Sequence, residues 1–396
     1  MNVRKPLLVL ALSLLLGNGV AVAAAADFDN GVKAAQSGDY KTALAEWIPL
    51  AEQGYANAQY YVAYLYLNGN GVPQNYKTAR QWFTQAAEQG NADAQYNLGV
   101  LYANGKGVPQ NAETAVKWFT KAAEQGQAEA QYNLGLTYDK GHGVSQNDKI
   151  AVKWYTKSAE QGQAEAQYNL GVMYQNERGV PQNYKIAVKW YIKSADQGFA
   201  HAQSNLGLMY INGYGVSRND KTAAKLFTLA AEQGYPVAQY NLGNMYSTGN
   251  GSGVPRDDKV AVKWYTKAAG QGYSDAQYNL GVMYRKGKGV SRNDKTAFKW
   301  HTKAATQGHA GAQYFLGFMY YDGYGFFKDK LRAYMWFTLA GLNGNSSSID
   351  SRLKVAKIMS PAQIDKAQEM SIRCLKSHYT DCENGSLLDR MLQILN

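Results

Sequence analysis

The chain has 396 residues, which is too long for one simple core and long enough for several domains or one extended array. Hydrophobic residues make up 45% of it, an ordinary share for a folded protein that excludes wholesale disorder. A formal net charge of +11 is compatible with nucleic-acid binding. The lysines recur at fixed positions, however, which is typical of a solvated helix face, so we expect no nucleic-acid partner.

The first 26 residues predict a secretory signal peptide. Arg4 and Lys5 give a charged start, the apolar stretch 7–16 is too short to span a bilayer, and small residues fill 21–26. We expect cleavage just before Asp27, and the alternative is an uncleaved membrane anchor. No cysteine lies near this site, which excludes a lipoprotein, and no later segment is apolar enough to span a membrane. The sequence therefore predicts a mature protein in the periplasm or outside the cell.

From residue 54 onward, a glycine recurs every 36 residues. One step, from Gly234 to Gly272, is 38 residues, and the two extra residues fall in the glycine-rich loop 249–253. Repeats of this length are too small to bury a core alone and are typical of stacked helical arrays. The closing glycines are Gly54, Gly90, Gly126, Gly162, Gly198, Gly234, Gly272, Gly308 and Gly344.

The residue pattern of each unit predicts two helices, and the unit that ends at Gly126 illustrates it. Ala94 and Leu98 are four residues apart, the spacing of one helix face, and Gly99 lets a neighbouring helix approach closely. The second helix carries apolar residues at i, i+3, i+4, i+7 and i+8 from Ala115. We expect first helices over 56–68, 92–104, 128–140, 164–176, 200–212, 236–248, 274–286 and 310–322, and second helices over 77–89, 112–125, 149–161, 185–197, 221–233, 259–271, 295–307 and 330–342.

Seven of the eight tryptophans lie eight residues before a closing glycine, at positions such as Trp118 and Trp154. Leu226 takes this position in one unit, and Trp47 is offset by one residue. Aromatic residues at a fixed helical position are far more often core than ligand contacts, so we expect these tryptophans to be buried in the core of each unit.

The two ends of the array depart from the repeat. We expect a partial repeat or cap over 27–55, eight repeats over 56–344, and a helical cap over 345–396, because arrays need atypical end units with a polar outer face. A new helix should begin after Ser360, where Pro361 stands at the first helical position.

Residues 94–126 contain Ala-x-x-x-Leu-Gly-x-x-Tyr, then Gly-x-Gly-Val, then Ala-x-x-Trp-x-x-x-Ala-Ala-x-x-Gly, and the pattern recurs along the chain. It resembles the Sel-one-like repeat (SLR) family, which is related to tetratricopeptide repeats, over about residues 40–344. Ala63 in place of the helix glycine and Glu177 in place of a loop glycine are local departures. The resemblance implies an all-α superhelix, or solenoid, of about eight helix–turn–helix repeats that serves as an adaptor or binding scaffold.

The sequence offers little chemistry. The five histidines show no metal-ligand spacing and no phosphate loop is present, so we expect no metal, no cofactor and no enzyme activity. Ser351 and Lys354 match the Ser-x-x-Lys motif of β-lactamases, and some SLR family members bind β-lactams, but the companion motifs are missing. For Cys374 and Cys382 an exported setting favours a structural disulfide, and a reactive pair is the alternative.

A second stripe lies on the first helices, on the side opposite Ala94 and Leu98. The resemblance to tetratricopeptide repeats implies that this side faces a concave groove. Nearly every unit places a tyrosine there, and tyrosine is enriched at interfaces because it offers a large contact area at low entropy cost. Packing against the adjacent unit is the equal alternative. The candidate binding residues are Tyr96, Tyr132, Tyr168, Tyr240, Tyr278, Arg285, Tyr314, Phe318 and Tyr321.

These patterns favour an exported, monomeric scaffold that binds a protein or peptide in this groove. The resemblance implies host-protein binding, cell-envelope assembly or neutralisation of a toxic effector, and all three stay open. One alternative is an envelope enzyme or binder that acts on peptidoglycan or β-lactams. Another is a surface protein drawn to anionic lipid or polysaccharide by its charge.

Overall fold

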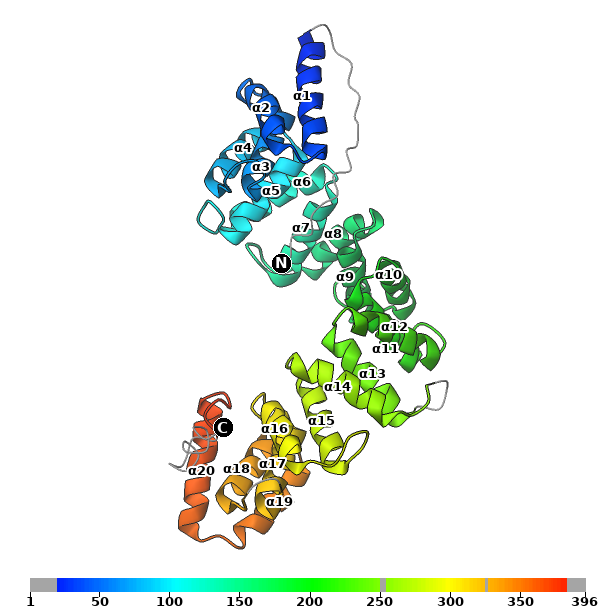
Figure 1. Ribbon diagram of the computed structural model, residues 1–396, viewed down its shortest axis with the longest axis vertical. Coiled ribbons are helices and arrows are strands. Elements are labelled where there is room, and N and C mark those ends of the chain that lie inside the picture. The colour runs from blue at the N-terminus through cyan, green and yellow to red at the C-terminus, as the bar shows by residue number, and fades with distance from the viewer. Residues whose placement is uncertain (1–19, 250–253, 325–326, 383–396) are drawn as a thin grey trace. The chain divides into compact units, whose positions relative to one another are not determined.

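The computed structural model describes residues 20–249, 254–324 and 327–382. These residues form twenty α-helices and contain no strand (Figure 1). The helices follow one another in pairs, one first helix and one second helix per repeat, so the predicted all-α solenoid of about eight repeats is confirmed. Most of the predicted signal peptide, residues 1–19, lies outside the described residues. Among the helices that the structure describes, none is long and apolar enough to cross a membrane.

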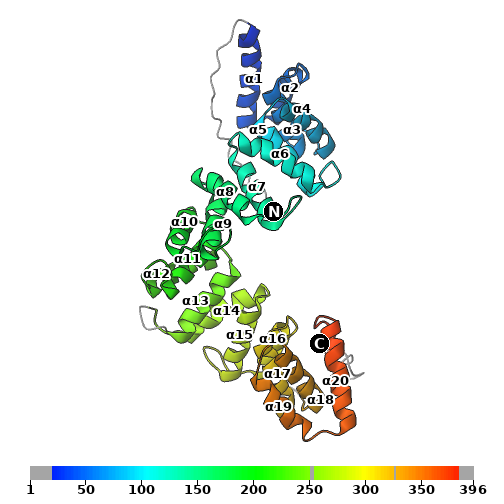
Figure 2. The same ribbon diagram turned by 180° about the vertical axis from the view of Figure 1, so that it is seen from behind.

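The chain divides into two compact units, residues 1–194 and 195–396, and each is described by itself. The boundary falls inside helix α10 (Tyr184–Asp196). Within a unit, the first helix of a repeat packs against its own second helix, and the second helix packs against the next first helix. Figure 2, which shows the chain from behind, confirms that such pairs lie side by side.

The unit 1–194 opens with two helices that precede the repeats, followed by four helix pairs. The helices are α1 (Val20–Gln36), α2 (Tyr40–Glu52), α3 (Ala56–Asn68), α4 (Tyr76–Glu88), α5 (Ala92–Asn104), α6 (Ala112–Glu124), α7 (Ala128–Lys140), α8 (Asp148–Glu160), α9 (Ala164–Gln175) and α10.

The unit 195–396 continues the series with four helix pairs and ends with two helices outside the repeat. The helices are α11 (Ala200–Asn212), α12 (Asp220–Glu232), α13 (Pro236–Thr248), α14 (Asp258–Gly270), α15 (Ser274–Lys286), α16 (Asp294–Ala305), α17 (Ala310–Asp322), α18 (Lys330–Leu342), α19 (Ser347–Ala356) and α20 (Pro361–Lys376).

Capping residues explain why the observed bounds fall so near the predicted ones. Asn111 accepts a hydrogen bond from the backbone N–H of Thr114 at 2.8 Å and so begins α6. Gly105 ends α5 in the left-handed conformation, with φ of 67°. Most second helices end one residue earlier than predicted because the glutamine before the closing glycine, such as Gln125, takes the capping position.

Glu177 adopts the left-handed conformation that glycine provides in most other repeats. Its φ is 58°, and the equivalent Gly141 has 71°. A side chain in this region strains the backbone by about 1–2 kcal/mol. We expect Glu177→Gly to raise the local free energy of unfolding by about 1 kcal/mol, measured by hydrogen exchange in α9 and α10. A change in the opposite sense, Gly141→Ala, should lower the local free energy of unfolding in α7 and α8. If neither variant has an effect, the backbone at Glu177 is not strained.

The prediction that the tryptophans are buried holds in some repeats, because Trp154, Trp264 and Trp336 are buried, but the centre of each repeat is filled by the aromatic residue that follows the tryptophan position. Phe119 is 3% exposed and Tyr155 is fully buried, whereas Trp118 is only half-buried. The reason is the first-helix glycine, because a Cβ placed on Gly99 would lie 2.7 Å from the Phe119 ring. The tryptophan packs instead on the cluster of the preceding repeat, as Trp118 does on the cluster that contains Phe83.

A row of buried glutamines joins successive repeats within each unit. Gln95 is 4% exposed, and its side-chain amide donates to the carbonyl of Ala87 in the preceding second helix at 3.0 Å. Its side-chain oxygen accepts from Gln125, in the second helix of its own repeat, at 2.7 Å. Both polar ends of the side chain are therefore satisfied, as burial requires. The same pattern recurs at Gln59, Gln131, Gln239, Gln277 and Gln313.

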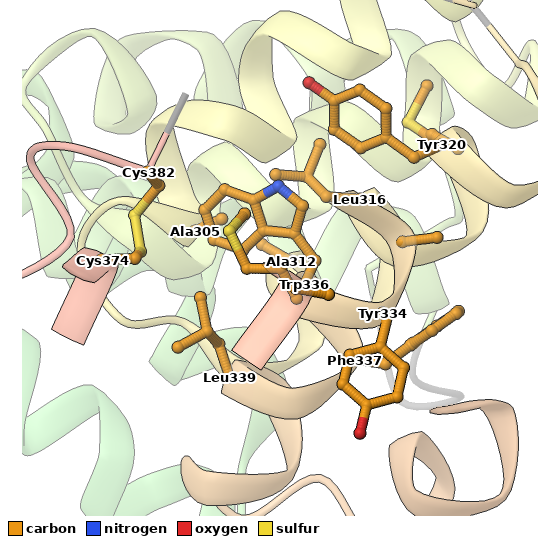
Figure 3. Close-up of a cluster of buried hydrophobic side chains, with 14 of the residues drawn as sticks. Ala305, Ala312, Leu316, Tyr320, Tyr334, Trp336, Phe337, Leu339, Cys374 and Cys382 are labelled. Carbon is orange, nitrogen blue, oxygen red and sulfur yellow. A yellow bond between two sulfur atoms is a disulfide. The ribbon is translucent and has the colours of Figure 1, made fainter. Parts of the chain in front are cut away.

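The segment after the last repeat contains one helix that the sequence pattern did not predict, α19, and one that it did, α20. Ser360 and Gln363 form the reciprocal capping box at the start of α20. A disulfide joins Cys374 of α20 to Cys382. Figure 3 shows this disulfide beside the ring of Trp336, which is fully buried, so α20 covers the end of the hydrophobic core.

Candidate functional site

The predicted tyrosines occupy one position on successive first helices, which we call the tyrosine ladder. In the unit 1–194 it consists of Tyr96 on α5, Tyr132 on α7 and Tyr168 on α9, and in the unit 195–396 of Tyr240 on α13, Tyr278 on α15 and Tyr314 on α17. All six side chains are half-buried. Each therefore contributes to packing and also leaves surface for a ligand.

Every ladder ring contacts the buried ring of its own second helix. The centroids of Tyr96 and Phe119 are 6.1 Å apart, and those of Tyr132 and Tyr155 are 6.0 Å apart. Tilted contacts at this distance favour the pair beyond the area that they bury. One side of each ring therefore packs within its own repeat. The remaining contacts are Tyr168 with Tyr191, Tyr240 with Tyr265, Tyr278 with His301, and Tyr314 with Phe337.

The hydroxyl end of a ladder tyrosine lies near the first helix of the following repeat. Burial raises the pKa of Tyr96, as does the Glu129 carboxylate on α7, while Asn133 on the same helix lowers it in part. Burial likewise raises the pKa of Tyr132 and of Tyr278. These phenols stay protonated at neutral pH and can donate hydrogen bonds.

Aromatic residues gather around the ladder in the unit 195–396. Tyr278 stacks on His309 with centroids 4.7 Å apart, and the Arg285 guanidinium lies 5.1 Å from the centroid of Phe315. Stacking on rings holds the planar guanidinium in one orientation. Arg285 therefore projects from a rigid aromatic surface rather than from a flexible loop.

The other predicted residues lie on the next first helix of this unit. Phe318 packs edge-on against Tyr314, with centroids 4.8 Å apart, and is half-buried. Tyr321, at the end of α17, is 36% exposed. The structure thus brings Tyr314 and Phe318 into direct contact. Arg285 on α15 contacts the ring of Phe315, which lies on α17 as both of these residues do.

Sequence reasoning missed the aromatic residues that precede first helices in this unit. Tyr273 contacts Tyr240 at 5.2 Å, and His309 occupies the same position before α17. In the unit 1–194, Asn91 and Gln127 stand at this position instead. The signal was present in the sequence, because an aromatic residue directly follows Gly234 and Gly272. Phe315 was also missed, at a position where the first repeat has Tyr61 and the other six have asparagine.

The Ser-x-x-Lys fragment does not form a catalytic pair in the structure. Ser351 is 9% exposed, and its hydroxyl donates to the backbone carbonyl of Ser347 at 3.3 Å. Lys354 is exposed, and no hydrogen bond joins it to Ser351 among the described residues. In the same part of the chain, no group of three or more His, Cys, Asp or Glu side chains is placed to hold a metal ion.

Comparison with protein families identifies the repeat. The family model described as the Sel1 repeat matches residues 56–91, 92–127, 128–163, 164–199, 200–235, 236–273, 274–309 and 310–345. The chain is a Sel1 repeat protein. Members of the family typically mediate protein–protein interaction, and such scaffolds are generally not enzymes.

Two solved structures share this Sel1 architecture over most of their length. A Sel1 repeat protein from Oxalobacter formigenes is 35% identical, with a TM-score of 0.58 over 76% of this chain and 91% of the other. A protective antigen of uropathogenic Escherichia coli strains, which displays an SLR fold, is 30% identical, with a TM-score of 0.56 over 92% and 94%. None of the curated proteins compared with this Sel1 repeat protein is significantly similar to it.

Proposed function

We propose that this Sel1 repeat protein is a scaffold that binds a protein or peptide along the tyrosine ladder. Contact is concentrated in the unit 195–396, around Tyr240, Tyr278, Arg285, Tyr314, Phe318 and Tyr321. The observation that carries this assignment is the stack of Arg285 on Phe315, next to the ring of Tyr278. Interfaces draw most of their binding energy from a few such aromatic and arginine anchors.

Tyr96, Tyr132 and Tyr168 form a second part of the tyrosine ladder within the unit 1–194, which we propose also binds a polypeptide. Their rings are held by Phe119, Tyr155 and Tyr191, so a ligand would meet a surface that is already ordered. Ordered side chains lose little conformational entropy on binding, which favours affinity. The partner would thus be a polypeptide that lays apolar and hydrogen-bonding groups across successive first helices.

The test uses the two predicted residues whose loss disturbs packing least. We expect Arg285→Ala with Tyr321→Ala to weaken partner binding at least tenfold, because anchors typically contribute 1–2 kcal/mol or more each, about one order of magnitude. Partners are captured from cell-envelope extract with the wild-type protein, identified by mass spectrometry, and their affinities remeasured by calorimetry with the variant.

The matched control is Tyr214→Ala with Lys288→Ala, which removes one tyrosine and one cation from loops of the same unit. Both variants should keep the helical circular dichroism of the wild type. If the control loses the captured partner and the ladder variant retains it, the ladder is not the site.

We also propose that the mature protein works in the periplasm or outside the cell, after removal of residues 1–26. The Cys374–Cys382 disulfide supports this, because disulfides persist in oxidising compartments. N-terminal sequencing of the protein from a secreting host should give Asp27 or a residue within a few positions of it. A mature chain that still carries Arg4 would overturn the proposal.

A further inference from the structure

The second helices carry lysines at a spacing that puts them on one face. On α8, Lys149, Lys153 and Lys157 follow one another every four residues, and all three are exposed. Steps of four residues advance only about 40° around a helix, so the three ammonium groups share a narrow stripe. The same spacing occurs on α10, α14 and α16, and α6 and α12 carry two such lysines each. We call this surface, within each unit, the lysine face.

Most carboxylates of these helices stand at the helix ends, and on α6 Glu113 takes the first position of the stripe, four residues before Lys117. Arg178 pairs with Asp148 at the start of α8, and Arg256 pairs with Asp258 at the start of α14 at 2.8 Å. Among the described residues, no carboxylate forms an ion pair with Lys153. Like charges four residues apart destabilise a helix by a few tenths of a kcal/mol, roughly 0.2–0.5 per pair, so an anionic ligand on this stripe would relieve a repulsion.

Tryptophan rings hold part of the lysine face in place. The ammonium of Lys121 lies 4.4 Å from the ring centre of Trp118, and that of Lys267 lies 4.6 Å from the ring centre of Trp264. Such contacts attract the cation to the ring face and limit the motion of a long side chain. An acidic ligand would therefore meet charges that are already ordered.

Shallow apolar depressions open between lysines on this face. In the unit 1–194, Lys117 and Lys121 flank Val116 and Trp118 on α6. In the unit 195–396, Lys221 and Lys225 flank a depression lined by Ala224, Val254 and Leu229, of which the last is 49% exposed. The lysine face thus combines shallow apolar depressions with lysine side chains at their edges.

We propose that the lysine face is a second docking surface, which binds an acidic polypeptide segment. Within one unit, its carboxylates would pair with the lysines and its apolar side chains would enter the depression of that unit, on α6 in the unit 1–194 or beside α12 in the unit 195–396. An anionic bilayer fits less well, because the apolar groups lie in depressions and the tryptophans lie under lysines, where a flat membrane surface does not reach. The surface uses other helices than the tyrosine ladder, so this proposal is independent of the first.

The experiment uses the full-length protein and a fluorescent synthetic peptide in which pairs of glutamates alternate with pairs of leucines. Binding is followed by anisotropy and by the tryptophan emission of the protein, which reports on rings beneath the lysines. We expect Lys117→Gln with Lys121→Gln, and separately Lys221→Gln with Lys225→Gln, to weaken binding about tenfold or more. The matched pair Lys286→Gln with Lys288→Gln removes the same charge from another surface and should change affinity less than about twofold.

Further arms of the experiment distinguish the occupant. Lys117→Arg with Lys121→Arg should keep the affinity, and polyglutamate without leucine should bind more weakly than the mixed peptide. Equal affinity for polyglutamate would mean that charge alone acts, and it would overturn the proposal. Tighter binding to phosphatidylglycerol vesicles than to the peptide would assign the face to membranes instead, and equal losses in the loop control would show that it has no specific role.

Discussion

Replacing Phe119 by alanine is expected to lower the free energy of unfolding of its repeat by about 3–5 kcal/mol, among the largest effects of a single substitution in this chain. The ring is 3% exposed, and it fills the space that Gly99 leaves open on the neighbouring helix. Alanine would leave a cavity between two helices whose backbones are held by the loops on either side. Neighbouring repeats depend on the same interface, so α5 and α7 should lose protection as well.

The matched variant is Trp118→Ala, one residue earlier on α6. Because that ring is only half-buried, its loss should cost about 1–2 kcal/mol despite its larger size. Hydrogen exchange resolved by helix is the suitable measurement, since an array need not unfold in two states. A larger loss of protection for Trp118→Ala than for Phe119→Ala would show that Trp118, and not Phe119, is the central residue of the core.

Acid is expected to loosen the repeat 274–309, because His301 stands where other repeats have phenylalanine or tyrosine. Its side chain is fully buried, and neither ring nitrogen has a hydrogen-bond partner among the described residues. Burial, together with the charges of Arg285 on α15 and His309 before α17, lowers the pKa of His301 to about 3. The ring of Phe315 stacks on the ring of His301 with centroids 5.2 Å apart, and it has no polar atom that could accept a hydrogen bond from a protonated imidazole.

The direction of the pH effect follows from these values. Between pH 6.5 and about 3, the unfolded chain binds a proton at His301 that the folded chain does not, so stability falls as the pH falls through this window. The slope approaches roughly 1.4 kcal/mol per pH unit below pH 6, so acidification from pH 6.5 to 4.5 should remove about 2.3 kcal/mol from the local free energy of unfolding. Hydrogen exchange of α15 and α16 at several pH values measures it.

His301→Phe provides the control for this prediction. It should abolish the extra acid sensitivity of α15 and α16 and, at neutral pH, raise local stability by about 1–3 kcal/mol, since two buried unpaired nitrogens are removed. Helices α7 and α8, where Tyr155 fills the equivalent position, should show neither effect. A pH dependence that persists in His301→Phe would place its origin in another group.

The fold was predictable because its determinants are local and repeated. Left-handed glycines such as Gly105 and capping residues such as Asn111 mark helix ends within a few residues of sequence, and they recur in most of the eight repeats. Periodicity placed both Trp118 and Phe119 on the apolar face of the second helix, but it could not show that Phe119 is the one that faces Gly99. Helix α19 was missed because it has no second copy with which to compare it.

For the candidate site, the sequence could predict only which residues share one side of the first helices. The position of Tyr278 follows from helical spacing, but its stacking on His309 joins two repeats, and a single-helix projection cannot show such a contact. Phe315 escaped notice because it replaces an asparagine on a different side of the helix from the tyrosine ladder. Which partner occupies the surface depends on chemistry outside this chain.

The buried glutamines have a consequence for how such a chain can change in length. Gln95 needs a carbonyl from the preceding repeat and an amide from its own second helix, and within each unit the other glutamines of this row make the same two bonds. The longer loop before α14 leaves the bond from Gln271 to Gln239 intact at 2.9 Å. Whole repeats can therefore be gained or lost by duplication or deletion without a new core, whereas a partial repeat would leave a buried amide unpaired. At the last joint Asn343 bonds both Gln313 and Tyr379, so the series closes on the segment after the array.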